Sequence, residues 1–127
     1  MKRILLLALV ALGLAVSARA SRFDFTQNDI SVTTTAQTIT VGTSTAPMSA
    51  VTIVNNGAAT DYVYARFFRT GETIVAAAAS STGGYKLAGG GTALTRSAPS
   101  YEGRPGYVAV SIVASGTSTV NVWATAR

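Results

Sequence analysis

Residues 107–125 read YVAVSIVASGTSTVNVWAT, and this stretch decides the fold class. Apolar and polar side chains alternate through it, which is typical of half-buried β-strands because successive side chains of a strand point to opposite faces. We expect two antiparallel strands, 107–113 and 118–125, joined as a hairpin by a turn at 114–116. The side chains expected on the apolar faces are Val108, Val110, Ile112, Val120 and Val122, with Asn121 and Trp123 pointing the opposite way.

Similar short segments precede this stretch. The expected strands are 30–41 (with Ile30, Val32, Ile39 and Val41 apolar), 51–54 (Val51 and Ile53 on one face), 62–69, 85–88 and 92–96, and Phe23 with Phe25 forms either a further strand or an N-terminal arm. Asn56-Gly57 predicts a hairpin between 51–54 and 62–69, since both residues tolerate positive φ. Residues 73–84 are expected to form a flexible loop or a short strand, because four alanines are too few to nucleate a helix.

Seven or eight short strands at even spacing predict an all-β fold, an antiparallel β-sandwich. The spacing leaves jelly-roll and immunoglobulin-like topologies both open. Residues 21–127 are expected to form this single domain. The chain has no cysteine, so the domain must depend on its hydrophobic core rather than on disulfides.

The first twenty residues have the layout of a bacterial-type secretory signal peptide. A basic start at residues 1–3 is followed by an apolar run over 4–16 and by Ala18-Arg19-Ala20, the small-residue pattern that signal peptidase cleaves. We expect cleavage after Ala20 and an exported domain. The alternative is a retained hydrophobic anchor over residues 4–18, although an apolar helix of about 20 Å is short for a bilayer core of about 30 Å.

The apparent basicity comes largely from this segment. The whole chain carries 10 basic and 5 acidic residues, a net charge of +5. Without Lys2, Arg3 and Arg19 the net charge falls to +2. The remaining basic residues are scattered at Arg22, Arg66, Arg69, Lys86, Arg96, Arg104 and Arg127. A scattered distribution of this kind does not predict a nucleic-acid partner, which requires a clustered basic surface.

The residue inventory argues against catalysis. The chain has no histidine and no cysteine, so the most common general base, the thiol nucleophile and the usual zinc ligands are missing. No nucleophile elbow, phosphate-binding loop or calcium loop is present. We therefore expect no enzyme activity, no catalytic residues, no cofactor and no metal.

Aromatic residues offer a candidate contact surface. Its members are Tyr62, Tyr64, Arg66, Tyr101 and Trp123, which could stack on a glycan or contact another protein. The alternative is that these rings are core or cross-strand pairs and that Arg66 stacks on a neighbouring ring. The mature chain is also poor in lysine and glutamate and rich in threonine and serine, and a surface of low charge suits coverage by other subunits.

Three segments resemble small β-sandwich proteins of tailed bacteriophages, such as capsid decoration or minor virion proteins. They are QTITVGTSTAPMSAVTIVNNGAATDYVYARFF (37–68), GGYKLAGGGTAL (83–94) and GYVAVSIVASGTSTVNVWA (106–124). The resemblance runs from Thr33 to Thr125 and implies a non-catalytic structural protein that packs against copies of itself or a capsid shell.

The predicted signal peptide conflicts with this resemblance, since tailed-phage virions assemble in the cytoplasm. Retained, residues 4–18 would tether the domain to a membrane, for example that of a virion. Cleaved, they would deliver an exported periplasmic or cell-surface module that binds a ligand or glycan. We expect a structural or assembly protein that forms homo-oligomers or packs against other structural proteins, with the exported binding module as the alternative.

Overall fold

The computed structural model describes residues 25–79, 84–98 and 105–126. This part of the chain folds into eight strands and no helix, which confirms the all-β prediction. The strands are β1 (Phe25–Val32), β2 (Gln37–Thr40), β3 (Ala50–Asn55), β4 (Val63–Arg69), β5 (Tyr85–Leu87), β6 (Thr92–Ser97), β7 (Tyr107–Ala114) and β8 (Ser118–Thr125). Within the same ranges, no helix of the length and apolarity needed to cross a membrane is present. The predicted signal peptide, residues 1–20, lies outside the described residues.

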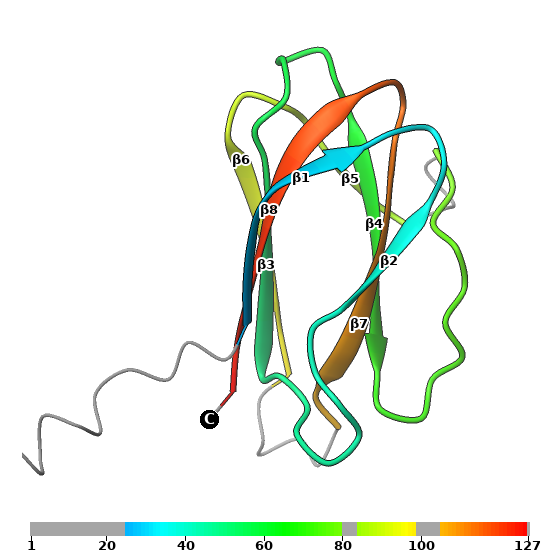
Figure 1. Ribbon diagram of the computed structural model, residues 1–127, viewed down its shortest axis with the longest axis vertical. Helices are drawn as coiled ribbons and strands as arrows, with labels where there is room; N and C mark the ends of the chain where they lie inside the picture. Colours follow the sequence, from blue (N-terminus) through cyan, green and yellow to red (C-terminus); the bar gives the residue numbers. More distant parts are fainter. Residues whose placement is uncertain (1–24, 80–83, 99–104, 127) are drawn as a thin grey trace, which may run out of the picture.

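The strands form two antiparallel sheets that face each other as a β-sandwich (Figure 1). Sheet A has the order β1-β8-β3-β6, and sheet B has the order β2-β7-β4-β5. Each strand of the first half of the chain pairs with its counterpart counted back from the end: β1 with β8, β2 with β7, β3 with β6 and β4 with β5. This is the strand order of an eight-stranded jelly roll, which decides between the two predicted topologies.

The hydrophobic core lies between the sheets and consists of alternate residues of each strand. Its fully buried members include Val32, Val51, Ile53, Val63, Val110, Ile112, Val120 and Val122. The predicted apolar faces of 51–54 and 118–125 are therefore confirmed. Val108 is the exception and is only half-buried. The register shifts where Arg69 pairs with Tyr107 and Phe68 with Ala109, so Val108 is the extra residue of a β-bulge and Tyr107 takes the core position.

The two predicted hairpins are wrong. Residues 107–114 and 118–125 lie in different sheets, and so do β3 and β4 on either side of Asn56-Gly57. Both connections cross from one sheet to the other instead of turning back within it. The predicted single strand 30–41 is also wrong. It divides into β1 in sheet A and β2 in sheet B, with a bend at residues 33–36.

One buried side chain explains why the connection after β3 crosses. Asn55 is fully buried, and its Nδ2 donates to the carbonyl oxygens of Asp61 (2.9 Å) and Leu87 (3.1 Å). Its Oδ1 accepts from the amide of Gly57 (3.1 Å) and the hydroxyl of Ser118 (2.6 Å). A type I′ hairpin would leave these partners unmet, so the long-range bonds override the local turn signal.

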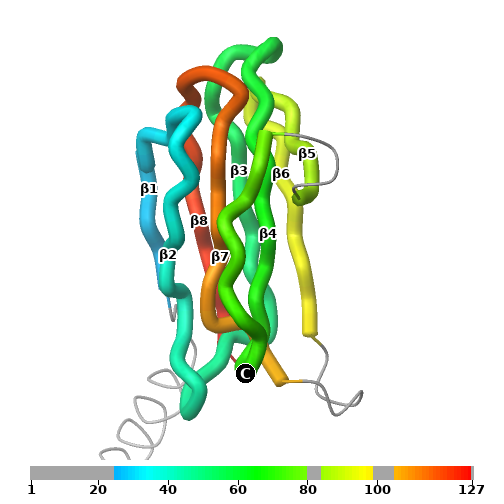
Figure 2. The backbone as a smooth tube through the Cα atoms, turned by 90° about the vertical axis from the view of Figure 1, so that its right-hand side faces the viewer, coloured from blue at the N-terminus to red at the C-terminus, as the bar shows by residue number. Residues whose placement is uncertain are grey.

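The segment after β4 covers part of the outer face of sheet B (Figure 2). Residues 73–79 form a loop without strand pairing, as predicted for the described part of 73–84. The amide of Ala77 donates to Ser111 Oγ on β7 (2.9 Å), and Ala77 is buried against Tyr64 and Val113. We call residues 70–79 the strap. The strap buries the middle of the outer face of sheet B, although the sequence pattern of β4 does not show which of its two faces is buried.

Candidate functional site

The outer face of sheet A carries uncharged side chains at its strand-paired positions, and Asp29 in the irregular part of the edge strand β1 is outside this set. One row crosses all four strands, because Trp123 on β8 pairs with Thr26 of β1 and Thr52 of β3, and Thr52 pairs with Thr95 of β6. The hydroxyls of Thr52 and Thr95 lie 2.8 Å apart and are hydrogen-bonded. The neighbouring outward positions of the paired strands are Ser31, Ala50, Val54, Ala93, Ser97, Thr119, Asn121 and Thr125. None of these side chains carries a charge.

Trp123 lies on a central strand of this face and is 40% exposed. Its indole Nε1 donates to Asn28 Oδ1 on β1 (3.0 Å), which holds the ring on the sheet. Asn28 and Asp29 form a bulge in β1, where Asp29 adopts a φ of 54° and its amide donates to Asn121 Oδ1. The bulge thus places an amide side chain beside the indole.

The structure separates the other predicted contact residues from Trp123. Tyr64 lies on the outer face of sheet B and is buried under the strap, so it belongs to a small satellite core. Tyr62 lies just before β4 with Lys86 Nζ 3.9 Å from its ring centroid. Arg66 lies on β4 between Tyr64 and Phe68 and is half-buried. Tyr101 lies outside the described residues. The predicted residues therefore do not form one continuous surface.

A second feature was not predicted from the sequence. At the side of the sandwich bounded by β4, β5 and β6, rings and guanidinium groups form a chain of contacts, which we call the ladder. Phe67 makes edge contacts with Tyr85 and Tyr107, both at 5.9 Å between centroids. The Arg96 guanidinium lies 4.8 Å from the Tyr85 ring, and the Arg69 guanidinium lies 5.3 Å from the Tyr107 ring. These five residues come from four strands, so only the topology brings them together.

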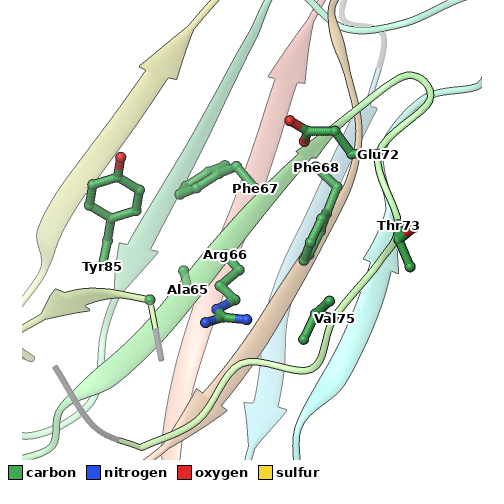
Figure 3. Close-up of a pocket in the computed structure, with 9 residues that line it drawn as sticks. Ala65, Arg66, Phe67, Phe68, Glu72, Thr73, Val75 and Tyr85 are labelled. Atoms are coloured by element: carbon green, nitrogen blue, oxygen red, sulfur yellow. The ribbon is translucent and has the colours of Figure 1, made fainter. Parts of the chain in front are cut away.

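The ladder borders a groove along β4 (Figure 3). The groove has a volume of about 470 Å³ and runs between the strap and β5. Phe67 and Tyr85 lie on one side of β4, and Phe68 and Val75 lie on the other. Val75 and Tyr85 are 49% and 45% exposed, so the apolar walls of the groove are open to solvent.

Charge is distributed unevenly over the molecule. Every basic residue in the described ranges lies on β4, β5 or β6: Arg66, Arg69, Lys86 and Arg96. The acidic residues of these ranges are Asp29, Asp61 and Glu72. Only Glu72 lines the groove, where its carboxylate accepts from the Arg69 amide at 2.7 Å. The groove itself therefore has apolar walls with one basic and one acidic side chain, Arg66 and Glu72, and the other three basic residues lie outside its lining.

Metal-ligating side chains do not gather at one place in the described ranges. No group of three metal-ligating side chains is present in them. No protein-family model, curated protein or solved structure matches the chain.

Proposed function

We propose that this protein is a non-catalytic structural protein that assembles with copies of itself through the outer face of sheet A. The observation that carries the proposal is the uncharged face around the 40% exposed Trp123. Jelly rolls occur in viral capsids, lectins and other proteins, so the fold by itself does not select a function. The side chains on the outer face of sheet A, and not the fold, therefore support the proposed assembly.

The chemistry of this face suits pairing with itself. Tryptophan is among the residues most enriched at the energetic centres of interfaces, and charged residues are depleted there. Two copies related by a two-fold axis would place the same patch against itself, which is unfavourable for a charged patch and neutral for one made of threonine, serine and alanine. The resemblance to phage virion proteins agrees with an assembling role. We also propose export through the segment 1–20.

Sedimentation velocity of the purified protein over a range of concentrations tests the proposal. We expect a dimer or larger oligomer, and we expect Trp123→Arg to weaken it by about 100-fold or more, since the substitution introduces like charges at the centre of the interface. Ile74→Arg is the matched control, because Ile74 is 47% exposed on the strap, away from sheet A. It should leave the assembly unchanged.

Two results would contradict self-assembly through the outer face of sheet A. A protein that stays monomeric at high concentration, while its Trp123 fluorescence responds to an oligosaccharide, is the exported glycan-binding module. Equal weakening by Trp123→Arg and Ile74→Arg would show that the contact lies elsewhere. The intact mass of the native protein separately tests export, since cleavage after Ala20 removes residues 1–20.

A further inference from the structure

We propose that the edge strand β6 is a second self-assembly contact, at which two copies of this chain pair antiparallel across a two-fold axis and join their A sheets into one continuous sheet. This contact uses the backbone at an edge of sheet A, whereas the contact proposed above uses side chains of the outer face. Either contact can therefore form without the other.

The four edge strands of the sandwich differ in length and regularity. β2 has four residues and β5 has three, while β1 is interrupted by the bulge at Asn28 and Asp29. Short edge strands and bulges are features by which proteins keep a sheet edge from pairing with another chain. β6 instead has six residues and pairs with β3 at every position from Thr92 to Ser97, without a register shift. Among the edge strands of the described ranges, β6 is thus the regular one.

The hydrogen bonds to β3 fix the direction of the β6 backbone. The Ala98 amide donates to the Ser49 carbonyl oxygen (2.7 Å), so the backbone of Ala98 faces β3. Backbone groups of an antiparallel strand point alternately to its two sides, so Leu94 and Arg96 also face β3. The amides and carbonyls of the residues between them point away from β3, to the edge of the sheet. These outward residues are Ala93, Thr95 and Ser97.

The outer side of β6 is open to solvent. All three outward residues are exposed, and within the described ranges sheet A ends at β6. The Tyr107 hydroxyl lies 3.4 Å from the Ser97 carbonyl oxygen, which keeps a second lone pair. A regular edge with solvated amides and carbonyls is a template for a strand from another chain.

Symmetry favours a second copy of this chain as that strand. With Thr95 on the two-fold axis, its amide and carbonyl exchange two hydrogen bonds with Thr95 of the second copy. Ala93 then pairs with Ser97 of the second copy, and Ser97 with Ala93, so every outward residue of β6 is paired. The side chains that meet are alanine, threonine and serine, which approach without charge repulsion.

The single charged side chain of β6 is compatible with this pairing. The Arg96 guanidinium lies 4.8 Å from the ring of Tyr85, which belongs to sheet B, so its charge is directed toward the facing sheet. In the proposed register Arg96 lies opposite Leu94 of the second copy rather than opposite another arginine. A foreign peptide is less favoured, because strand addition takes its specificity from side-chain pockets and the small outward residues provide none.

Hydrogen exchange measured by NMR tests the contact in the Trp123→Arg variant, in which the face contact is removed. We expect the amides of Ala93, Thr95 and Ser97 to exchange about tenfold more slowly in concentrated than in dilute protein, since pairing gives them hydrogen bonds. The amides of Leu94 and Arg96 are the internal control. They point to β3 in every copy, so their exchange should not depend on concentration.

Substitutions at Thr95 separate the backbone from the side chain. Thr95→Pro removes an outward amide, and proline is tolerated on an edge strand where the N–H faces solvent. Thr95→Ala is the matched control, because both substitutions remove the hydroxyl bonded to Thr52 and only proline removes the amide. In the Trp123→Arg background, sedimentation should show a dimer that Thr95→Pro weakens about tenfold or more and Thr95→Ala less than about twofold.

A second position keeps the test decisive if circular dichroism shows that Thr95→Pro does not fold. Ala93→Pro with Ala93→Ser as its control repeats the comparison at another outward amide. The same weakening by proline alone is expected there.

The two self-assembly contacts fail separately. A Trp123→Arg protein that is monomeric at all concentrations, with unprotected β6 amides, would overturn the β6 contact and leave the face contact standing. Equal weakening by Thr95→Pro and Thr95→Ala would also overturn it. A dimer that persists in Trp123→Arg and dissociates with Thr95→Pro supports the β6 contact, whatever sedimentation of the wild type shows for the face.

Discussion

Ser118 Oγ donates a 2.6 Å hydrogen bond to Asn55 Oδ1 and so joins the start of β8 to the end of β3. The Asn55 amide nitrogen donates to two carbonyl oxygens. One belongs to Asp61 in the connection from β3 to β4, and the other belongs to Leu87 at the end of β5, just before the chain crosses to β6. With the Gly57 amide as its fourth partner, the buried side chain of Asn55 has both donors and both acceptor sites in use. A single residue thus connects three of the passages between the sheets at one end of the jelly roll.

Removing this side chain is expected to destabilise the fold strongly. Asn55→Ala leaves the Ser118 hydroxyl and the Leu87 carbonyl without their buried partner, and each such loss costs about 1–3 kcal/mol. We expect the free energy of unfolding in urea to fall by roughly 3 kcal/mol. Asn56→Ala is the control, because Asn56 is exposed, and it should change this free energy by less than about 0.5 kcal/mol. Equal effects of the two substitutions would show that the network does not stabilise the crossings.

The same end of the molecule requires glycine at position 89. A Cβ added there would lie 1.9 Å from the carbonyl oxygen of Ala58, which is backbone and cannot move aside. We expect Gly89→Ala to lower the free energy of unfolding by about 1–3 kcal/mol. Gly116→Ala meets no atom within 4 Å and should be neutral or slightly stabilising. Thermal unfolding of the two variants side by side checks this, and a stable Gly89→Ala protein would contradict the close approach.

The sequence predicts side-chain direction better than strand partners. Val51, Ile53, Val120 and Val122 face the core as expected, because the period of two depends only on the strand itself. The turn residues 114–117 fit a hairpin and a sheet crossing equally well. What decides is the bond from Ser118 to Asn55, 63 residues away. A local sequence pattern does not reveal a hydrogen bond between residues so far apart. The all-β fold class was therefore predictable, and the jelly-roll strand order was not.

The candidate sites show the same limit. Trp123 was predicted to point away from the core, and it does, because its neighbours Val122 and Ala124 are buried. The ladder was missed because its members are separated in the chain and meet only where β5 is short. Arg96 reaches Tyr85, and Phe67 reaches Tyr107, across strands whose adjacency follows from topology alone.

The core makes a direct prediction for paired isoleucines. Ile53 is fully buried between the sheets, whereas Ile74 is 47% exposed on the strap. Ile53→Ala removes buried methyl groups and leaves a cavity, so we expect a loss of about 2–5 kcal/mol in the free energy of unfolding. Ile74→Ala should change it by no more than about 0.5 kcal/mol. Urea unfolding of both variants measures the difference, and similar losses would mean that Ile74 is buried in solution.

The strap makes the last prediction, because its only buried residue in the described part is Ala77, held by one bond to Ser111 Oγ. Ser111→Ala removes the acceptor and leaves the Ala77 amide without a partner, which costs about 1–2 kcal/mol locally. We expect hydrogen exchange at Ala77 to accelerate by about tenfold, while exchange at Val110 and Ile112 on β7 changes little. Thr38→Ala, an exposed change on the neighbouring strand β2, is the control and should leave Ala77 exchange as it is. If Ser111→Ala left the protection of Ala77 unchanged, packing of Ala77 against Tyr64 and Val113 would hold the strap without the hydrogen bond.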